Sequence, residues 1–136
     1  LDETLSGDET WSGITTPGTL GGTVATGAVV YLASDGDWEE VDGILDGTDT
    51  GFDKQLGICV DGGVATDPTT ILLQGKVRSA EFPAFTIGSA VYLSDTIGEL
   101  VVAQPNTTNF AIRIVGYATT AEDLYFNPSN DYIVHV

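Results

Sequence analysis

Two stretches of the chain repeat one pattern of apolar and polar positions. Residues 26–35 read Thr-Gly-Ala-Val-Val-Tyr-Leu-Ala-Ser-Asp, and residues 87–95 read Ile-Gly-Ser-Ala-Val-Tyr-Leu-Ser-Asp. In both, a glycine precedes a run of β-branched and aromatic residues, and a cluster rich in Ser, Asp and Gly follows it, which is typical of a short strand entering a tight turn. Gly57 and Gly116 later stand in matching contexts. The pattern predicts a duplicated β unit.

Each copy is expected to form a β-hairpin. The second limbs are the apolar and acidic segments 38–41 and 99–103. Gly36 and Gly98 lie between the limbs, where glycine adopts positive φ without the cost that other residues have. We therefore expect a β domain over residues 23–136, with pseudo-repeats at about 23–80 and 84–136.

The remaining segments are also short and apolar, with turn residues between them. Pro83 marks a connector between the repeats, because proline cannot donate to a strand ladder. Segment 119–123 could form one helical turn, and no amphipathic helix of ten or more residues is present. Short strands with frequent turn signals predict an all-β fold, a small β-barrel or β-sandwich. The further strands are predicted at 56–60, 70–73 (which 76–79 continues or follows), 110–118, 124–126 and 131–136.

The first 22 residues show neither the period of a strand nor that of a helix. They are rich in Gly, Thr, Ser and acidic residues, with sparse apolar side chains. We expect an extended N-terminal arm that is mobile in the free protein and becomes ordered on a partner, or else a floppy terminus. The candidate partner-binding residues are Leu5, Trp11, Ile14 and Leu20, with Trp11 as the main anchor.

Charge is the strongest feature of the composition. The chain has 136 residues, 20 acidic and four basic, with a formal net charge of −16. Nucleic acid is excluded as a partner because phosphate contacts need clustered Lys and Arg. No apolar run approaches the roughly 20 residues of a membrane helix, so no membrane partner is expected. The chain contains no methionine, even at position 1, so we expect a processed or trimmed form or a part of something longer.

Catalytic chemistry is not indicated. Cys59 and His135 are the single cysteine and the single histidine, so a zinc site lacks ligands and a nucleophile–base pair would need both of them. Cys59 is interpreted as a small core residue and His135 as a strand-end residue. Glu39 and Glu40 are adjacent on a predicted strand and should point to opposite faces. We expect no enzyme activity and no cofactor.

The loop 42–51 is rich in Asp and Gly and invites comparison with a calcium site. No register of this loop supplies the alternating ligands, the glycine at the sixth position and the glutamate at the twelfth that an EF-hand requires. Asp-Gly turns are the favoured interpretation, and a bound cation remains the alternative.

The motif Gly-x-x-Val-Tyr-Leu-Ser, followed by Gly-x-Leu, Val-Gly-Tyr-Ala and a short terminal strand, resembles a virion module. It is similar to the small β-rich decoration (cement) proteins and head-fibre or tail-fibre proteins of tailed double-stranded DNA viruses. The resemblance extends from about residue 21 to 136. It is carried by Gly88, Val91, Tyr92, Leu93, Gly98, Leu100, Gly116 and Ala118, and in the first copy by Gly27, Val30, Tyr31, Leu32, Gly36 and Gly57.

The resemblance implies a structural protein on the capsid exterior, a homotrimer that binds the major capsid protein and stabilises the shell. The alternative is a carbohydrate-binding or receptor-binding β module of a fibre, in which Trp11, Trp38 or Tyr31 would stack on sugar rings. Tyr31 and Tyr92 recur at equivalent positions in the two copies, which favours a core role for both.

Overall fold

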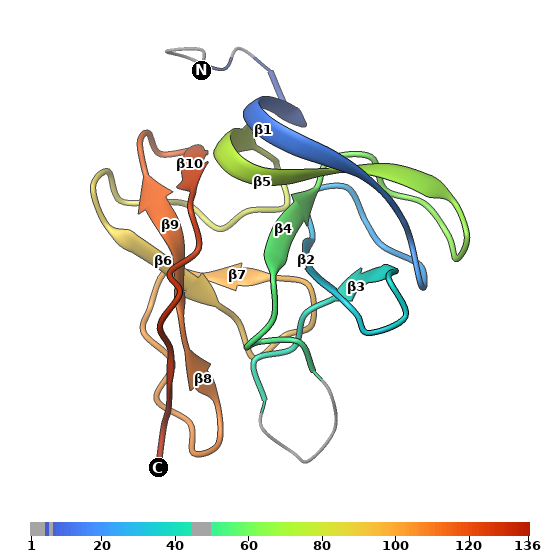
Figure 1. The fold of residues 1–136 in the computed structure, drawn as a ribbon. Coiled ribbons are helices and arrows are strands. Elements are labelled where there is room, and N and C mark those ends of the chain that lie inside the picture. The colour runs from blue at the N-terminus through green and yellow to red at the C-terminus, as the bar shows by residue number, and fades with distance from the viewer. Residues whose placement is uncertain (1–4, 6, 45–49) are drawn as a thin grey trace.

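The computed structural model describes residues 5, 7–44 and 50–136, and these residues contain strands and no helix (Figure 1). The strands are β1 (Thr10–Thr19), β2 (Val29–Leu32), β3 (Trp38–Glu40), β4 (Leu56–Cys59), β5 (Pro68–Arg78), β6 (Ala90–Leu93), β7 (Leu100–Val101), β8 (Ala111–Ile112), β9 (Ile114–Ala118), β10 (Asp123–Phe126) and β11 (Ile133–Val134).

The strands form one curled antiparallel sheet, a half-barrel, in the order β3-β2-β4-β5-β10-β9-β6-β7. β1 pairs with β5 outside this path, and β8 and β11 form a separate two-stranded ribbon. The predicted all-β fold is confirmed. β5 joins the two parts of the sheet, because β4 pairs with its first half and β10 with its second half.

The order of the strands is that of a duplicated unit. β3-β2-β4-β5 in the first copy corresponds to β7-β6-β9-β10 in the second, and the copies meet where β5 pairs with β10. The registers also correspond, since Val30 lies opposite Gly57 and Val91 lies opposite Gly116. Both predicted hairpins, β2–β3 and β6–β7, are confirmed. Gly36 and Gly98 follow the first limbs with φ of 95° and 74°, as the turn pattern predicts.

Main-chain hydrogen bonds join the first copy to the second beside the outer hairpins of the half-barrel. Gly98 N donates to Val41 O at 2.8 Å, and Val29 N donates to Gly98 O at 3.1 Å. Two residues after Val41, Gly43 O accepts a hydrogen bond from Ala111 N at 2.7 Å. The first copy and the second copy therefore share main-chain hydrogen bonds beside β2 and β3 as well as at the β5–β10 pair.

Two apolar clusters fill the fold. The larger one contains side chains from both copies, and Phe126, Leu56 and Leu93 are among its fully buried members. The smaller one belongs to the first copy and contains Trp38 and Leu20. Each large apolar side chain that is fully buried in these clusters stabilises the fold by about 1.5–3 kcal/mol. Because the larger cluster draws on both copies, we expect the repeats to fold as one unit.

The structure corrects the expected boundary of the N-terminal arm. Residues 10–19 are not an arm outside the β domain but a ten-residue strand of it, paired with β5 along its whole length. The sequence hides this strand because neither of its faces is fully buried, so its side chains follow no period of two. Its position depends on main-chain bonds to residues about 60 positions away.

The structure decides one open alternative and changes two smaller expectations. Segment 76–79 continues segment 70–73, because both belong to β5, which ends at Arg78. The predicted strand 110–118 is interrupted at Arg113, whose side chain turns inward and separates β8 from β9. Segment 119–123 forms no helical turn; Thr119 N and Thr120 N both donate to Asp123 O, which makes a tight link from β9 to β10.

Candidate functional site

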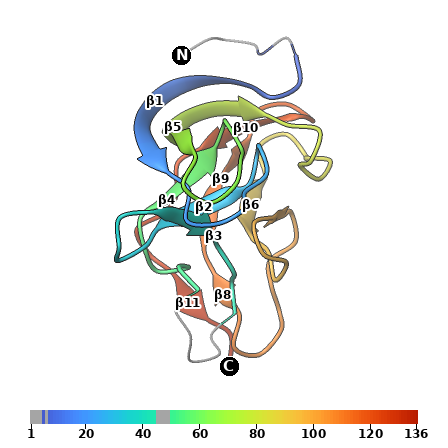
Figure 2. The ribbon, with the colours of Figure 1, turned by 90° about the vertical axis from the view of Figure 1, so that its right-hand side faces the viewer.

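β1 is the outer edge of the sheet. It pairs with β5 on one side, and no strand of the described residues pairs with its other side. Figures 1 and 2 show β1 outermost on the molecule in both views. A free strand edge presents N–H and C=O groups to which another chain can add.

The edge lacks charged side chains, which are one of the usual protections of such strands. Residues 10–19 include no charged side chain, although 24 of the 136 residues in the chain are Asp, Glu, Lys or Arg. Natural edge strands are commonly guarded by charges, bulges or proline. β1 has Pro17 near one end, and its partner β5 bulges at Leu73. The first half of β1, with Trp11 and Ile14, is the open part of the edge.

The structure divides the four predicted anchor residues into two groups. Trp11 is 40% exposed and Ile14 is 62% exposed, so both are available to a partner. Leu20 is fully buried beside Trp38, and Leu5 is 4% exposed. Leu5 and Leu20 are therefore buried within the chain itself, contrary to the expectation that they are open to a partner. Trp11 and Ile14 remain as the candidate partner-binding residues that a partner can reach.

The aromatic residues of the carbohydrate alternative are mostly inaccessible. Trp38 and Tyr31 are each only 4% exposed, and the Tyr31 hydroxyl donates to Glu39 Oε2 at 3.1 Å. The expected core role of Tyr31 is confirmed, whereas Tyr92 is half-buried. Of the three proposed sugar-stacking residues, Trp11 alone has an exposed ring system.

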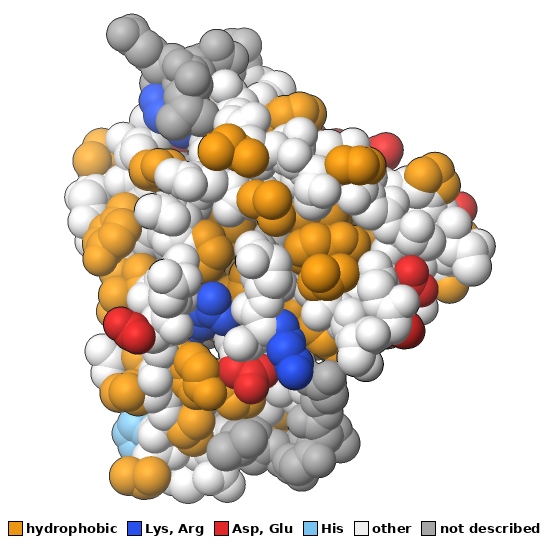
Figure 3. Space-filling model, viewed as in Figure 1, with side chains coloured by type: hydrophobic (Ala, Val, Ile, Leu, Met, Phe, Trp, Pro, Cys, Tyr) orange, Lys and Arg blue, Asp and Glu red, His pale blue; other side chains and the backbone are white. Residues whose placement is uncertain are grey.

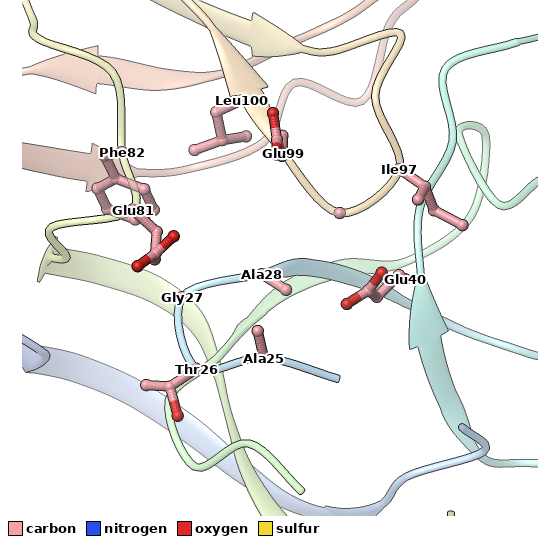
Figure 4. A pocket seen from close by; sticks show the side chains of 11 residues that line it. Ala25, Thr26, Gly27, Ala28, Glu40, Glu81, Phe82, Ile97, Glu99 and Leu100 are labelled. Atoms are coloured by element: carbon pink, nitrogen blue, oxygen red, sulfur yellow. The ribbon is translucent and has the colours of Figure 1, made fainter. Parts of the chain in front are cut away.

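An acidic hollow of about 150 Å³ lies where the two hairpins meet (Figure 4). Glu40, Glu81 and Glu99 line it from three different segments of the chain. In the close-up, Glu81 and Glu40 lie on opposite sides of the hollow. In the described part of the chain, no group of three His, Cys, Asp or Glu residues is placed to hold a metal ion. The hollow offers no convergent chemistry.

The Asp-rich loop 42–51 is described at its two ends, and residues 45–49 lie outside the described residues. The Asp42 carboxylate accepts a hydrogen bond from Ile44 N at 3.1 Å. This is the turn that an Asp makes with the backbone two residues on, in keeping with the favoured interpretation of the loop.

Cys59 is fully buried in the smaller cluster, which confirms its predicted core role. Its Sγ lies 3.3 Å from Thr69 Oγ1, and Thr69 Oγ1 donates to Asp61 O at 2.7 Å. Since the threonine proton is used for Asp61, the thiol is the donor to Thr69. Burial raises the pKa of the Cys59 thiol, which disfavours the reactive thiolate.

An ion pair between the partly exposed Arg78 and the buried Asp123 joins the two copies at the β5–β10 pair. Arg78 Nε donates to Asp123 Oδ1 at 2.7 Å, and Arg78 Nη1 lies 3.2 Å from Glu122 Oε2. The hydrogen bond with Asp123 is the main cause that raises the pKa of Arg78. Asp123 is 1% exposed and its Oδ2 has no hydrogen-bond partner, so this carboxylate depends on Arg78.

Sequence reasoning missed that Lys54 and Arg113 lie next to each other in the fold. Each stands three residues before a repeat glycine, Gly57 or Gly116, and so at equivalent positions of the two copies. The fold brings them together, since Arg113 Nη1 donates to Lys54 O at 2.9 Å. The spacing was a usable signal, because these are half of the four basic residues in the chain.

No protein-family model matches the chain, and no curated protein matches it either. The described residues also contain no helix that is long and apolar enough for a membrane span.

Proposed function

We propose that this chain is a structural decoration protein that docks on the outside of a tailed-virus capsid through the open edge of β1. The observation that carries the proposal is an uncharged, singly paired edge strand on a molecule of net charge −16. An edge with exposed Trp11 and Ile14 can add to a strand of the major capsid protein by main-chain hydrogen bonds, with the two side chains in pockets.

Two further observations support the proposal. Most of the residues that carry the resemblance to virion modules lie in or beside the equivalent hairpins of the two copies, and Gly57, Gly116 and Ala118 lie in the neighbouring strands β4 and β9. Among the described residues, no group of three His, Cys, Asp or Glu side chains is placed to hold a metal ion. A homotrimer on the threefold points of the lattice is part of the same proposal.

A fibre-type sugar-binding module remains the second candidate. Its support is narrower, because Trp11 is the exposed member of the aromatic set that the sequence suggests for stacking on a sugar ring. A ring at 40% exposure can serve a protein pocket as well as a sugar. Retention on neutral oligosaccharide columns that is lost in Trp11→Ala would favour this candidate.

The test is co-sedimentation with empty shells of the parent virus. Truncation of residues 1–22 is unsuitable because it would remove a strand and expose β5. Point substitution is cleaner. Trp11→Ala should weaken binding about thirtyfold, the loss of roughly 2 kcal/mol that one packed aromatic anchor contributes. Ile14→Lys, which places a charge on the same edge, should also weaken it.

Two matched variants control for loss of any exposed apolar residue. Tyr117 is an aromatic residue of β9 with 51% exposure, and Ile87 is 70% exposed in the connector before β6. Tyr117→Ala and Ile87→Lys should bind like the parent. The proposal is overturned if the parent does not bind shells, or if the β9 and connector variants lose as much binding as the β1 variants.

A further inference from the structure

A polar hollow of about 540 Å³ lies between β1, β5 and the segments that precede β4 and follow β10. Its lining includes Lys54 and Arg113, two of the four basic residues in the chain. Figure 3 shows basic side chains close to one another on the face of Figure 1, with an acidic side chain beside them. Such a gathering is unexpected on a molecule of charge −16 and calls for a physical explanation.

Arg113 is held rigidly and is 93% buried, with 7% of its surface exposed. Its Nε donates to Ser129 O at 2.9 Å, and its Nη1 donates to Phe52 O at 2.8 Å and Lys54 O at 2.9 Å. These three carbonyls fix the plane of the guanidinium. Nη2 has no protein partner among the described residues and is not sealed from solvent, so it faces the hollow that Arg113 lines.

The charge of Arg113 is not neutralised by a contact. Among the described residues, no carboxylate lies within 4.0 Å of Arg113 or Lys54, since the ion pairs found there all involve Arg78. Burial lowers the pKa of Arg113, and the more distant charge of Asp53 opposes this effect. A buried arginine stays protonated in proteins and requires a counter-ion or hydrogen-bond acceptors. Carbonyl groups supply part of that need and leave Nη2 for a ligand.

Four amide side chains of the lining are suited to hydroxyl groups, and Ile14, Leu73 and Pro128 are its apolar members. Gln55, Gln74, Asn127 and Asn130 contribute amide side chains, which both donate and accept. Gln74 is itself fixed, because its Nε2 donates to the Tyr125 hydroxyl at 2.8 Å. Small-molecule sites typically combine a charged group with a few such polar groups on a scaffold of strands.

We propose that this hollow binds a small hydroxylated carboxylate, of the class that includes the uronic acids. The carboxylate accepts from Arg113 Nη2 and from the Lys54 ammonium, and the amide side chains take the hydroxyls. This site recognises charge and hydroxyls rather than the face of a sugar ring, so it differs from the aromatic platforms that the sequence suggests. Ile14 of β1 also lines the hollow, but ligand binding is tested on the free protein without shells, so this proposal and shell docking can fail separately.

The probe is sodium D-glucuronate, followed by amide chemical-shift changes in an NMR titration. We expect saturable shifts confined to residues around the hollow. D-Glucose, which lacks the carboxylate, and acetate, which lacks the hydroxyls, should each bind far more weakly. Arg113 is kept in all variants because its three carbonyl bonds are part of the fold.

Three substitutions separate a site from a general charge effect. Lys54→Gln should weaken glucuronate binding about threefold, the size expected for one exposed ion pair. Lys76→Gln changes the net charge equally but lies outside the hollow, on β5, and should have no effect. Asp53→Asn removes the acidic group of the lining and should strengthen binding.

The proposal is overturned by any of three results. One is the absence of saturable binding by glucuronate. Another is equal binding of glucuronate with glucose or acetate, the latter meaning an adventitious ion only. The third is an equal loss of affinity in Lys54→Gln and Lys76→Gln, which would show that overall charge rather than the hollow attracts the ligand.

Discussion

Gly13 of β1 lies directly opposite Gly75 of β5, and each fills the space in which the other would carry a side chain. A Cβ on Gly13 would meet the Gln74 carbonyl oxygen, and a Cβ on Gly75 would meet the Ser12 carbonyl oxygen. The backbones of the two strands therefore approach as closely as they do only because both residues are glycine. This contact lies beside the bulge at Leu73, where the β1–β5 ribbon changes register.

Gly75→Ala should lower the free energy of unfolding by about 2–4 kcal/mol, because backbone atoms cannot move aside as a flexible side chain can. Urea denaturation measures this change. Gly22→Ala is the control, since a Cβ on Gly22 meets no atom within 4 Å. Equal stabilities of the two variants would show that the ribbon relaxes without cost and that β1 is loosely held.

The Arg78–Asp123 pair should be more costly to break than to replace. Arg78→Met leaves the buried Asp123 carboxylate without its donor, whereas Arg78→Met combined with Asp123→Leu removes the charge as well. We expect a lower Tm for the single variant than for the double variant. Calorimetry of both decides the matter, and a single variant as stable as the parent would contradict the role of the pair in joining the copies.

Cys59 should make the protein less stable in alkali. Its folded pKa is raised above the unfolded value by burial, so its contribution to stability is complete below pH 9.0, the ordinary value for this thiol, and is lost as pH rises through the folded pKa. The loss approaches about 1.4 kcal/mol per pH unit within that window. Unfolding of the parent and of Cys59→Ala, measured from neutral pH to above the thiol pKa, tests this. Parallel pH curves for the two proteins would refute the assignment.

Salt should stabilise the protein. The chain has 20 acidic residues, and the salt bridges found among its described residues, with Asp123 and Glu122, both involve Arg78. Tm should therefore rise from about 10 mM NaCl upward, with much of the rise complete near 0.1 M, where the screening length is about 10 Å. Differential scanning fluorimetry over a NaCl series gives the answer. A flat Tm would mean that the acidic groups lie far enough apart to repel one another little.

The local pattern of the sequence was sufficient for the hairpins. A short run of β-branched and aromatic residues specifies a strand, and glycine at positions 36 and 98 specifies the turn that follows, so the signal lies within about ten residues. The repeat of that signal predicted two equivalent hairpins. The core role of Cys59 followed from its place inside an apolar run, and that of Tyr31 from its recurrence as Tyr92, although Tyr92 itself is half-buried.

Tertiary structure decided the edge and the hollow. β1 has no periodic side-chain pattern because main-chain bonds to β5 place it, and such bonds leave no trace in side-chain order. Lys54 and Arg113 are 59 residues apart, one repeat, and meet only because the two copies fold against each other. The sequence by itself determined which segments become strands and that the unit is duplicated. Which strand edge stays open and which charges converge depend on contacts between residues distant in the chain, and a local pattern does not encode those.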